Sequence, residues 1–127
     1  MKVYKNEKNI VLLLFIILLF VVFSAKASFV EGLEDVPLPK NVTQIENGSL
    51  SFDNEEIRFF ESYLAVEKQN FEHVVKFYND TLPQMGWQKK GSAKQKISFE
   101  RDGESLEITK ESEKPLILRL VVKSKQQ

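Results

Sequence analysis

The pattern of apolar and polar residues predicts one helix in the middle of the chain. Apolar side chains in residues 71–82 recur at i, i+3, i+4, i+7 and i+11, which aligns them in one stripe of a helix: Phe71, Val74, Val75, Tyr78 and Leu82. Asn70 is a suitable N-cap, and Pro83 disfavours helical backbone in the residue before it. Gly86 can take the left-handed position after the helix, so we expect Trp87 to pack back on the last turn.

Two strands are predicted before this helix. Leu50 and Phe52 alternate with polar residues, which is typical of a short strand. A turn follows at residues 53–54, and residues 56–66 are rich in aromatic and β-branched side chains. Apolar side chains do not alternate perfectly in this second strand. We therefore expect a β-bulge near Glu61.

Three strands are predicted after the helix. The dipeptide Asp102-Gly103 favours a two-residue hairpin turn. This turn pairs Arg101 with Glu104, Phe99 with Leu106 and Ile97 with Ile108, and we expect the first pair to form an ion pair. The last strand spans residues 116–122. The predicted fold is α+β, with an antiparallel sheet of about five strands and one helix on one face, in the order strand, strand, helix, strand, strand, strand.

The start of the chain predicts export. Three lysines precede an unbroken apolar run over residues 10–23, and small residues follow it. A run of this length is short for a membrane span and typical of a signal peptide, which we expect to be cut between Ala27 and Ser28. The alternative is an uncleaved anchor in the inner membrane, with the protein facing the periplasm. We divide the chain into a signal peptide (1–27), an extended arm or tether (28–48) and a small domain (49–127).

The composition excludes several kinds of functional site in the exported part of the chain. The chain has no cysteine, which excludes a lipid-modified cysteine, a cysteine-based zinc site and a thiol nucleophile. Residues 28–80 carry 4 basic and 11 acidic side chains, and residues 81–127 carry 10 basic and 6 acidic ones. We expect these unequal halves to attract each other within one fold. The alternative is that the basic half steers an anionic partner.

No motif in the chain indicates catalysis, a cofactor or a metal. His73, the only histidine, lies opposite the apolar stripe, so we expect it to be a solvated surface residue. The neighbours Glu55 and Glu56 are expected to be solvated in a turn. Lysines flank Gly91-Ser92 and predict a basic, flexible loop that aids solubility: Lys89, Lys90, Lys94 and Lys96. Without interleaved aromatic residues, this loop does not indicate nucleic-acid binding.

The second face of the predicted sheet is the candidate interaction surface. Phe77 lies off the core stripe of the helix, and Ile117 and Val121 face away from the other apolar residues of the last strand. A single helix covers one face of a sheet, so something else should cover these residues. The alternatives are the arm of residues 28–48, a second subunit or a protein partner.

Several segments resemble a known group of proteins. The matching residues are Pro37-Leu38-Pro39, Phe52-Asp53, Phe77-Tyr78, the run from Leu82 to Trp87 and the run from Phe99 to Leu106. The chain is similar to small exported proteins of alphaproteobacteria with the pattern FY…LPxxGW…FxRxGExLxI. These motifs are structural, and the resemblance implies no activity. Members often have Gly-Arg before the isoleucine of the second strand, whereas here Arg58 follows Ile57.

The sequence as a whole predicts an exported, non-enzymatic domain without a cofactor. We expect it to bind a protein partner, or a second copy of itself, through the second sheet face. The alternative is a small carrier that holds a lipid or another apolar ligand between helix and sheet; an enzyme ranks third. We expect no nucleic-acid partner and no stable membrane span after processing.

Overall fold

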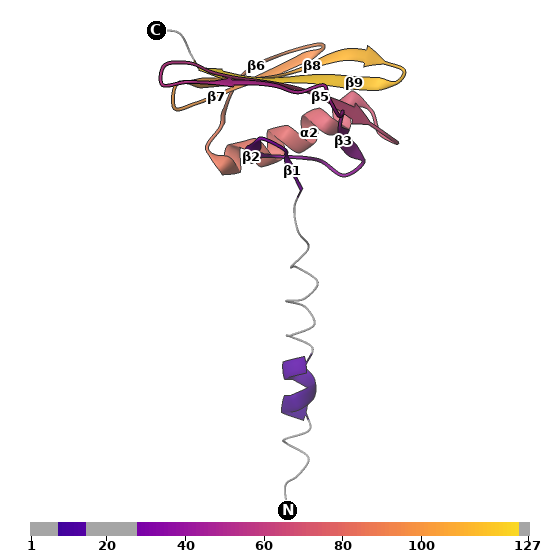
Figure 1. The fold of residues 1–127 in the computed structure, drawn as a ribbon. Coiled ribbons are helices and arrows are strands. Elements are labelled where there is room, and N and C mark those ends of the chain that lie inside the picture. The colour runs from indigo at the N-terminus through magenta and orange to yellow at the C-terminus, as the bar shows by residue number, and fades with distance from the viewer. Residues whose placement is uncertain (1–7, 15–27, 125–127) are drawn as a thin grey trace, which may run out of the picture.

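The computed structural model describes residues 8–14, which are helical, and residues 28–124, which form the folded part of the protein. In the folded part a large sheet forms one layer (Figure 1). The helix α2 (Phe71–Thr81) and the short strands β1 (Phe29–Val30) and β2 (Leu33–Pro37) lie together on one side of it. We call the sheet face toward α2 the inner face and the opposite one the outer face.

The large sheet has seven strands, and every strand is antiparallel to its neighbours. Along the sheet the order is β3-β5-β9-β8-β7-β6, and β4 also pairs with β5, on the edge that β3 occupies. The strands are β3 (Val42–Gln44), β4 (Leu50–Asp53), β5 (Arg58–Val66), β6 (Gln88–Ala93), β7 (Lys96–Arg101), β8 (Glu104–Glu113) and β9 (Leu116–Ser124).

The α+β class and the antiparallel sheet agree with the sequence-based prediction, but the expected count of about five strands was wrong. One extra strand, β3, comes from residues 28–48, and another, β6, comes from the lysine-rich segment that we expected to be a flexible loop. Pairing with β7 holds β6 in place, with a register shift between Lys89 and Gly91. Tertiary pairing therefore creates strands where the local pattern of apolar residues is weak.

The helix begins and ends as its sequence predicts. The Asn70 side chain accepts a hydrogen bond from the Nα–H of His73 at 3.0 Å. After α2 the chain makes one turn of 3-10 helix, η1 (Leu82–Met85), and Gly86 takes a φ of 90°. The backbone N–H of Trp87 then donates to the Leu82 carbonyl at 3.1 Å. This bond turns the side chain of Trp87 back into the core, where the residue is 1% exposed.

The core fills the space between the inner face and the elements that cover it. From the sheet come residues such as Phe60, Leu64, Phe99, Leu106 and Leu120, and from the other layer come Phe71, Val74, Tyr78, Leu82 and Trp87. Burying apolar side chains of this size contributes about 1.5–3 kcal/mol each. A chain without disulfides is thus stabilised by packing.

Residues 28–48, expected as an extended arm or tether, contain β1, β2 and β3 and contribute to the core. Val30, Leu33 and Val36 are at most 1% exposed. The Tyr78 hydroxyl donates to the Pro37 carbonyl at 2.9 Å, and burial raises the pKa of this phenol. These residues therefore pack beside α2 on the inner face, and they leave the outer face open.

The hairpin between β7 and β8 has the predicted register. Asp102 and Gly103 have φ values of 46° and 78°, as a type I′ turn requires, and Arg101 lies opposite Glu104. The prediction of an ion pair between these two residues was wrong. Arg101 instead pairs with Asp35 of β2, and Glu104 pairs with Arg58 of β5 at 2.9 Å. Both side chains point to the inner face, where other elements offer closer partners.

The predicted bulge near Glu61 is also absent from the structure. β5 pairs with β4 and with β9 in unbroken register. The imperfect alternation has another cause: Ser62 occupies a fully buried inner-face position and shares a hydrogen bond with the Ser49 hydroxyl at 2.9 Å. A polar residue thus stands where the apolar pattern predicted a hydrophobic one.

Candidate functional site

The outer face of the sheet is left uncovered by the folded part (Figure 1). Among residues 28–124, no helix or strand lies over it, and Figure 1 shows it as the free side of the sheet. Alternate residues of each strand point to it because side chains alternate between the two faces. On the neighbouring strands β5 and β9 these residues are Phe59, Glu61, Tyr63 and Ala65 of β5 and Ile117, Arg119, Val121 and Lys123 of β9.

Cross-strand ion pairs occupy the middle of the outer face. Arg119 of β9 binds Glu61 of β5, with its Nε 2.7 Å from the carboxylate. This hydrogen bond is the main reason that the pKa of Arg119 is raised. Towards β6, Lys96 pairs with Glu107 at 3.2 Å and Lys90 with Glu100 at 3.5 Å. The charges of this region are therefore largely compensated within the protein.

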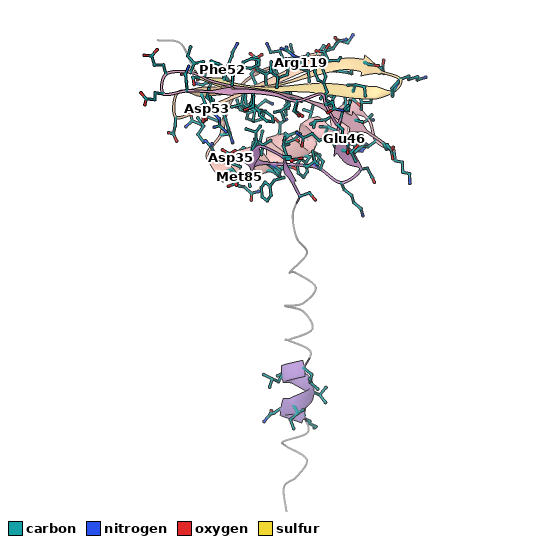
Figure 2. All side chains as sticks on the ribbon, viewed as in Figure 1. Asp35, Glu46, Phe52, Asp53, Met85 and Arg119 are labelled. Atoms are coloured by element: carbon teal, nitrogen blue, oxygen red, sulfur yellow. The ribbon has the colours of Figure 1, made fainter. Side chains whose placement is uncertain are left out.

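At the hairpin of β4 and β5, the exposed side chains of the outer face are apolar instead of charged. Leu50, Phe52 and Ile57 are 58%, 56% and 46% exposed. Phe52 lies opposite Phe59 in the ladder, and the Asn54 N–H donates to the Ile57 carbonyl, so all four apolar side chains share the outer face. We call Leu50, Phe52, Ile57 and Phe59 the apolar corner. Phe52 is labelled in Figure 2.

Acidic residues border the apolar corner. Asp53, Glu55 and Glu56 lie in the same hairpin, and all three are exposed. Within residues 28–124, none of them forms an ion pair. The corner is thus an exposed apolar surface with the unpaired carboxylates of Glu55 and Glu56 at its end, while Asp53 points to the inner side of the same strand.

The three residues of the predicted interaction surface do not lie together. Ile117 and Val121 are on the outer face, but Val121 is only 5% exposed because its neighbours on β5 and β8, Glu61 and Glu107, flank it. Phe77 is on the inner side, where its ring meets Tyr78 edge-on with centroids 5.1 Å apart. It also lines a surface groove with Pro37, Leu38 and Pro39. Helix α2 carries Phe77 away from the outer face.

Sequence reasoning missed the apolar corner, although it identified the strand that forms it. The alternation of Leu50 and Phe52 with serine and aspartate shows that one side of this strand is apolar. An alternating strand normally directs its apolar side to the core. Here the register with β5 directs that side outward, and Ser51 and Asp53 take the inner positions.

The other residues considered in the sequence analysis are exposed to solvent or take part in backbone hydrogen bonds. His73 is exposed, and its backbone N–H donates to the Asn70 side chain that caps the helix. No group of histidine, aspartate or glutamate side chains suited to a metal ion occurs among the described residues. The expected cleavage site is described only in part: Ala27 lies outside the described residues, and the Ser28 carbonyl accepts a hydrogen bond from the Leu38 N–H at 2.8 Å.

The packing of the core bears on the carrier alternative. The space between helix and sheet, where a carrier would hold its ligand, is filled by large, fully buried side chains that include Trp87, Tyr78 and Phe99. In the stretches 8–14 and 28–124, no helix is long and apolar enough to cross a membrane.

Comparison with known proteins gives no relative from which to infer a function. No protein-family model, no curated protein and no solved structure matches the chain.

Proposed function

We propose that this protein is an exported, non-enzymatic domain that binds a protein partner through the outer face of its sheet, with the apolar corner as the anchor. The observation that carries the proposal is the exposure of Leu50, Phe52 and Ile57 on one side of one hairpin. A cluster of exposed apolar side chains beside charged residues is typical of a protein-binding surface. Aromatic residues such as Phe52 are enriched in the centres of such interfaces.

The proposed surface replaces the one expected from the sequence. Val121 lies next to Glu61 but is almost fully buried, and Ile117 lies farther along β9, beyond Arg119. Phe77 is not part of the surface. The charged residues around Arg119 would form a polar rim, which gives orientation more than affinity. The packed interior favours this function over the carrier, because a ligand between helix and sheet would have to displace core side chains.

The experiment is site-specific photo-crosslinking in the native compartment. A photoreactive residue replaces Phe52 in one variant and, as a matched control, His73 in another. Both positions are exposed, but His73 lies on α2, on the other side of the sheet. The intact mass and the membrane fractionation of the native protein are measured first. A chain that starts at Ser28 establishes cleavage, and one that starts at Met1 and fractionates with the membrane establishes an anchor.

We expect a discrete crosslinked product from position 52 and none from position 73. A product with the mass of two copies would assign the surface to self-association. Equal products from both positions, or none from position 52, would contradict the proposal. Lipid recovered in fixed stoichiometry from the purified protein would favour the carrier instead.

A further inference from the structure

Strand β4 is a free edge of the sheet. It pairs with β5 on one side, and no strand of residues 28–124 pairs with it on the other. Hydrogen-bonded and non-hydrogen-bonded pairs alternate along an antiparallel ladder. Because the Asn54 N–H bonds to the Ile57 carbonyl, the alternation directs the main-chain groups of Ser51 and Asp53 away from β5. Two residues of this edge thus offer N–H and C=O groups to another chain.

The opposite edge of the sheet is built differently. β6 has a register shift between Lys89 and Gly91, and its residues are all exposed and mostly polar. Lysines, glycine and irregular pairing are the usual protection of an edge against further strands. β4 has no bulge and no lysine, and it carries Leu50 and Phe52 instead. Of these two strands within residues 28–124, β4 therefore combines a regular backbone with apolar side chains, whereas β6 does not.

The negative charge beside β4 indicates which kind of strand could pair with it. Asp53, Glu55 and Glu56 are exposed and uncompensated, so the edge favours a basic segment. The same charges disfavour a second copy that pairs through its own β4, because two sets of carboxylates would approach each other. Pairing with β6 of a second copy is disfavoured by the register shift of that strand and its lack of large apolar side chains.

We infer that the partner presents a basic, extended segment that adds to β4 as a further antiparallel or parallel strand. Main-chain hydrogen bonds to Ser51 and Asp53 hold the segment, and alternate apolar side chains of the segment pack on Leu50 and Phe52. Its lysine or arginine side chains lie beside the three carboxylates of the hairpin. This inference rests on the proposed function and specifies the chemistry of the partner.

The test uses a short synthetic peptide in which lysine and valine alternate, titrated into the purified exported protein. Binding is followed by the NMR shifts of the backbone amides. One control peptide has glutamate in place of lysine. A second control keeps the lysines but carries N-methyl groups on alternate amides, which removes main-chain donors and leaves the charge unchanged.

Two protein variants with equal loss of charge complete the test. In the first, Asp53→Asn, Glu55→Gln and Glu56→Gln neutralise the hairpin. In the second, Glu34→Gln, Glu67→Gln and Glu111→Gln neutralise three exposed carboxylates outside it. Sedimentation of the unmodified protein shows whether it associates with itself.

We expect the lysine peptide to shift amides of residues 50–57, with Ser51 and Asp53 among them. The glutamate peptide should not bind, and the N-methylated peptide and the hairpin variant should each bind about tenfold more weakly. The second variant should bind as the unmodified protein does. If the N-methylated peptide bound as tightly as the lysine peptide, binding would depend on non-specific charge attraction and not on main-chain hydrogen bonds. That result would overturn the inference.

A stable dimer in which β4 is protected would also overturn the inference, because a second copy would then occupy the edge. The failure of this inference is distinct from that of the proposed function. If the lysine peptide does not bind and position 52 still crosslinks to another protein, the apolar corner is a binding surface whose partner uses a different chemistry.

Discussion

Arg101 of β7 and Asp35 of β2 form an ion pair that joins the end of the β7–β8 hairpin to the N-terminal strands. The Arg101 guanidinium also donates to the Met85 carbonyl at 3.0 Å and lies 4.3 Å from the centre of the Trp87 ring. One side chain thus connects the hairpin, the end of the helix and the segment of residues 28–48. Figure 2 shows Asp35 and Met85 close together beneath the sheet.

Arg101→Ala should destabilise the protein more than Asp35→Ala. The first change removes three contacts and the second removes one. A hydrogen bond to a charged group contributes about 1.5–3 kcal/mol, so Asp35→Ala should cost about that amount and Arg101→Ala clearly more. Denaturant unfolding of both variants and of the double variant measures this. Costs that simply add in the double variant would show that the two residues do not interact.

Trp87→Ala should lower the free energy of unfolding by about 3–5 kcal/mol, because it empties a large site in the core. Trp87→Phe is the matched control and should cost less. The indole N–H is buried and has no hydrogen-bond partner among the described residues, so phenylalanine loses volume but no hydrogen bond. If Trp87→Ala kept its stability but lost a binding partner, the residue would belong to a recognition surface.

Gly103→Val should cost about 1–3 kcal/mol, because Gly103 has a φ of 78° and a β-branched residue is strained there. A Cβ at this position would meet no atom within 4 Å, so the strain comes from the backbone alone. Gly103→Asn should therefore be tolerated much better, since asparagine adopts this conformation more readily. Thermal melting of the two variants checks the prediction, and equal midpoints would contradict it.

The buried hydroxyl of Tyr78 should make the protein less stable in alkali. Burial raises the pKa of this phenol in the folded state above its value of about 10 in the unfolded chain. The neutral form is thus favoured by folding, and its contribution to stability is present below about pH 10 and is lost as the pH rises above that. Tyr78→Phe cannot ionise there and should show a weaker loss of stability in alkali.

At neutral pH, Tyr78→Phe should be less stable than the unmodified protein by about 1 kcal/mol, because the Pro37 carbonyl loses its donor. Urea midpoints at several pH values measure both effects. Parallel curves for the two proteins would show that the hydroxyl does not couple folding to pH.

Features set by neighbouring residues could be predicted from the sequence. The helix followed from the spacing of Phe71, Val74 and Tyr78 and from the cap at Asn70, because each depends only on contacts within a few positions. The register of the β7–β8 hairpin followed from Asp102 and Gly103, since a two-residue turn determines which residues lie opposite each other.

Features that depend on distant segments could not be predicted. Arg101 bonds to a residue far away in the chain, and β6 is a strand because β7 lies beside it. The outward direction of Leu50 and Phe52 depends on how β4 pairs with β5, whereas alternation alone says only that one side of the strand is apolar. The local pattern thus specified the elements and their apolar sides, while the packing of segments far apart in the chain decided which apolar side was buried and which remained open to a partner.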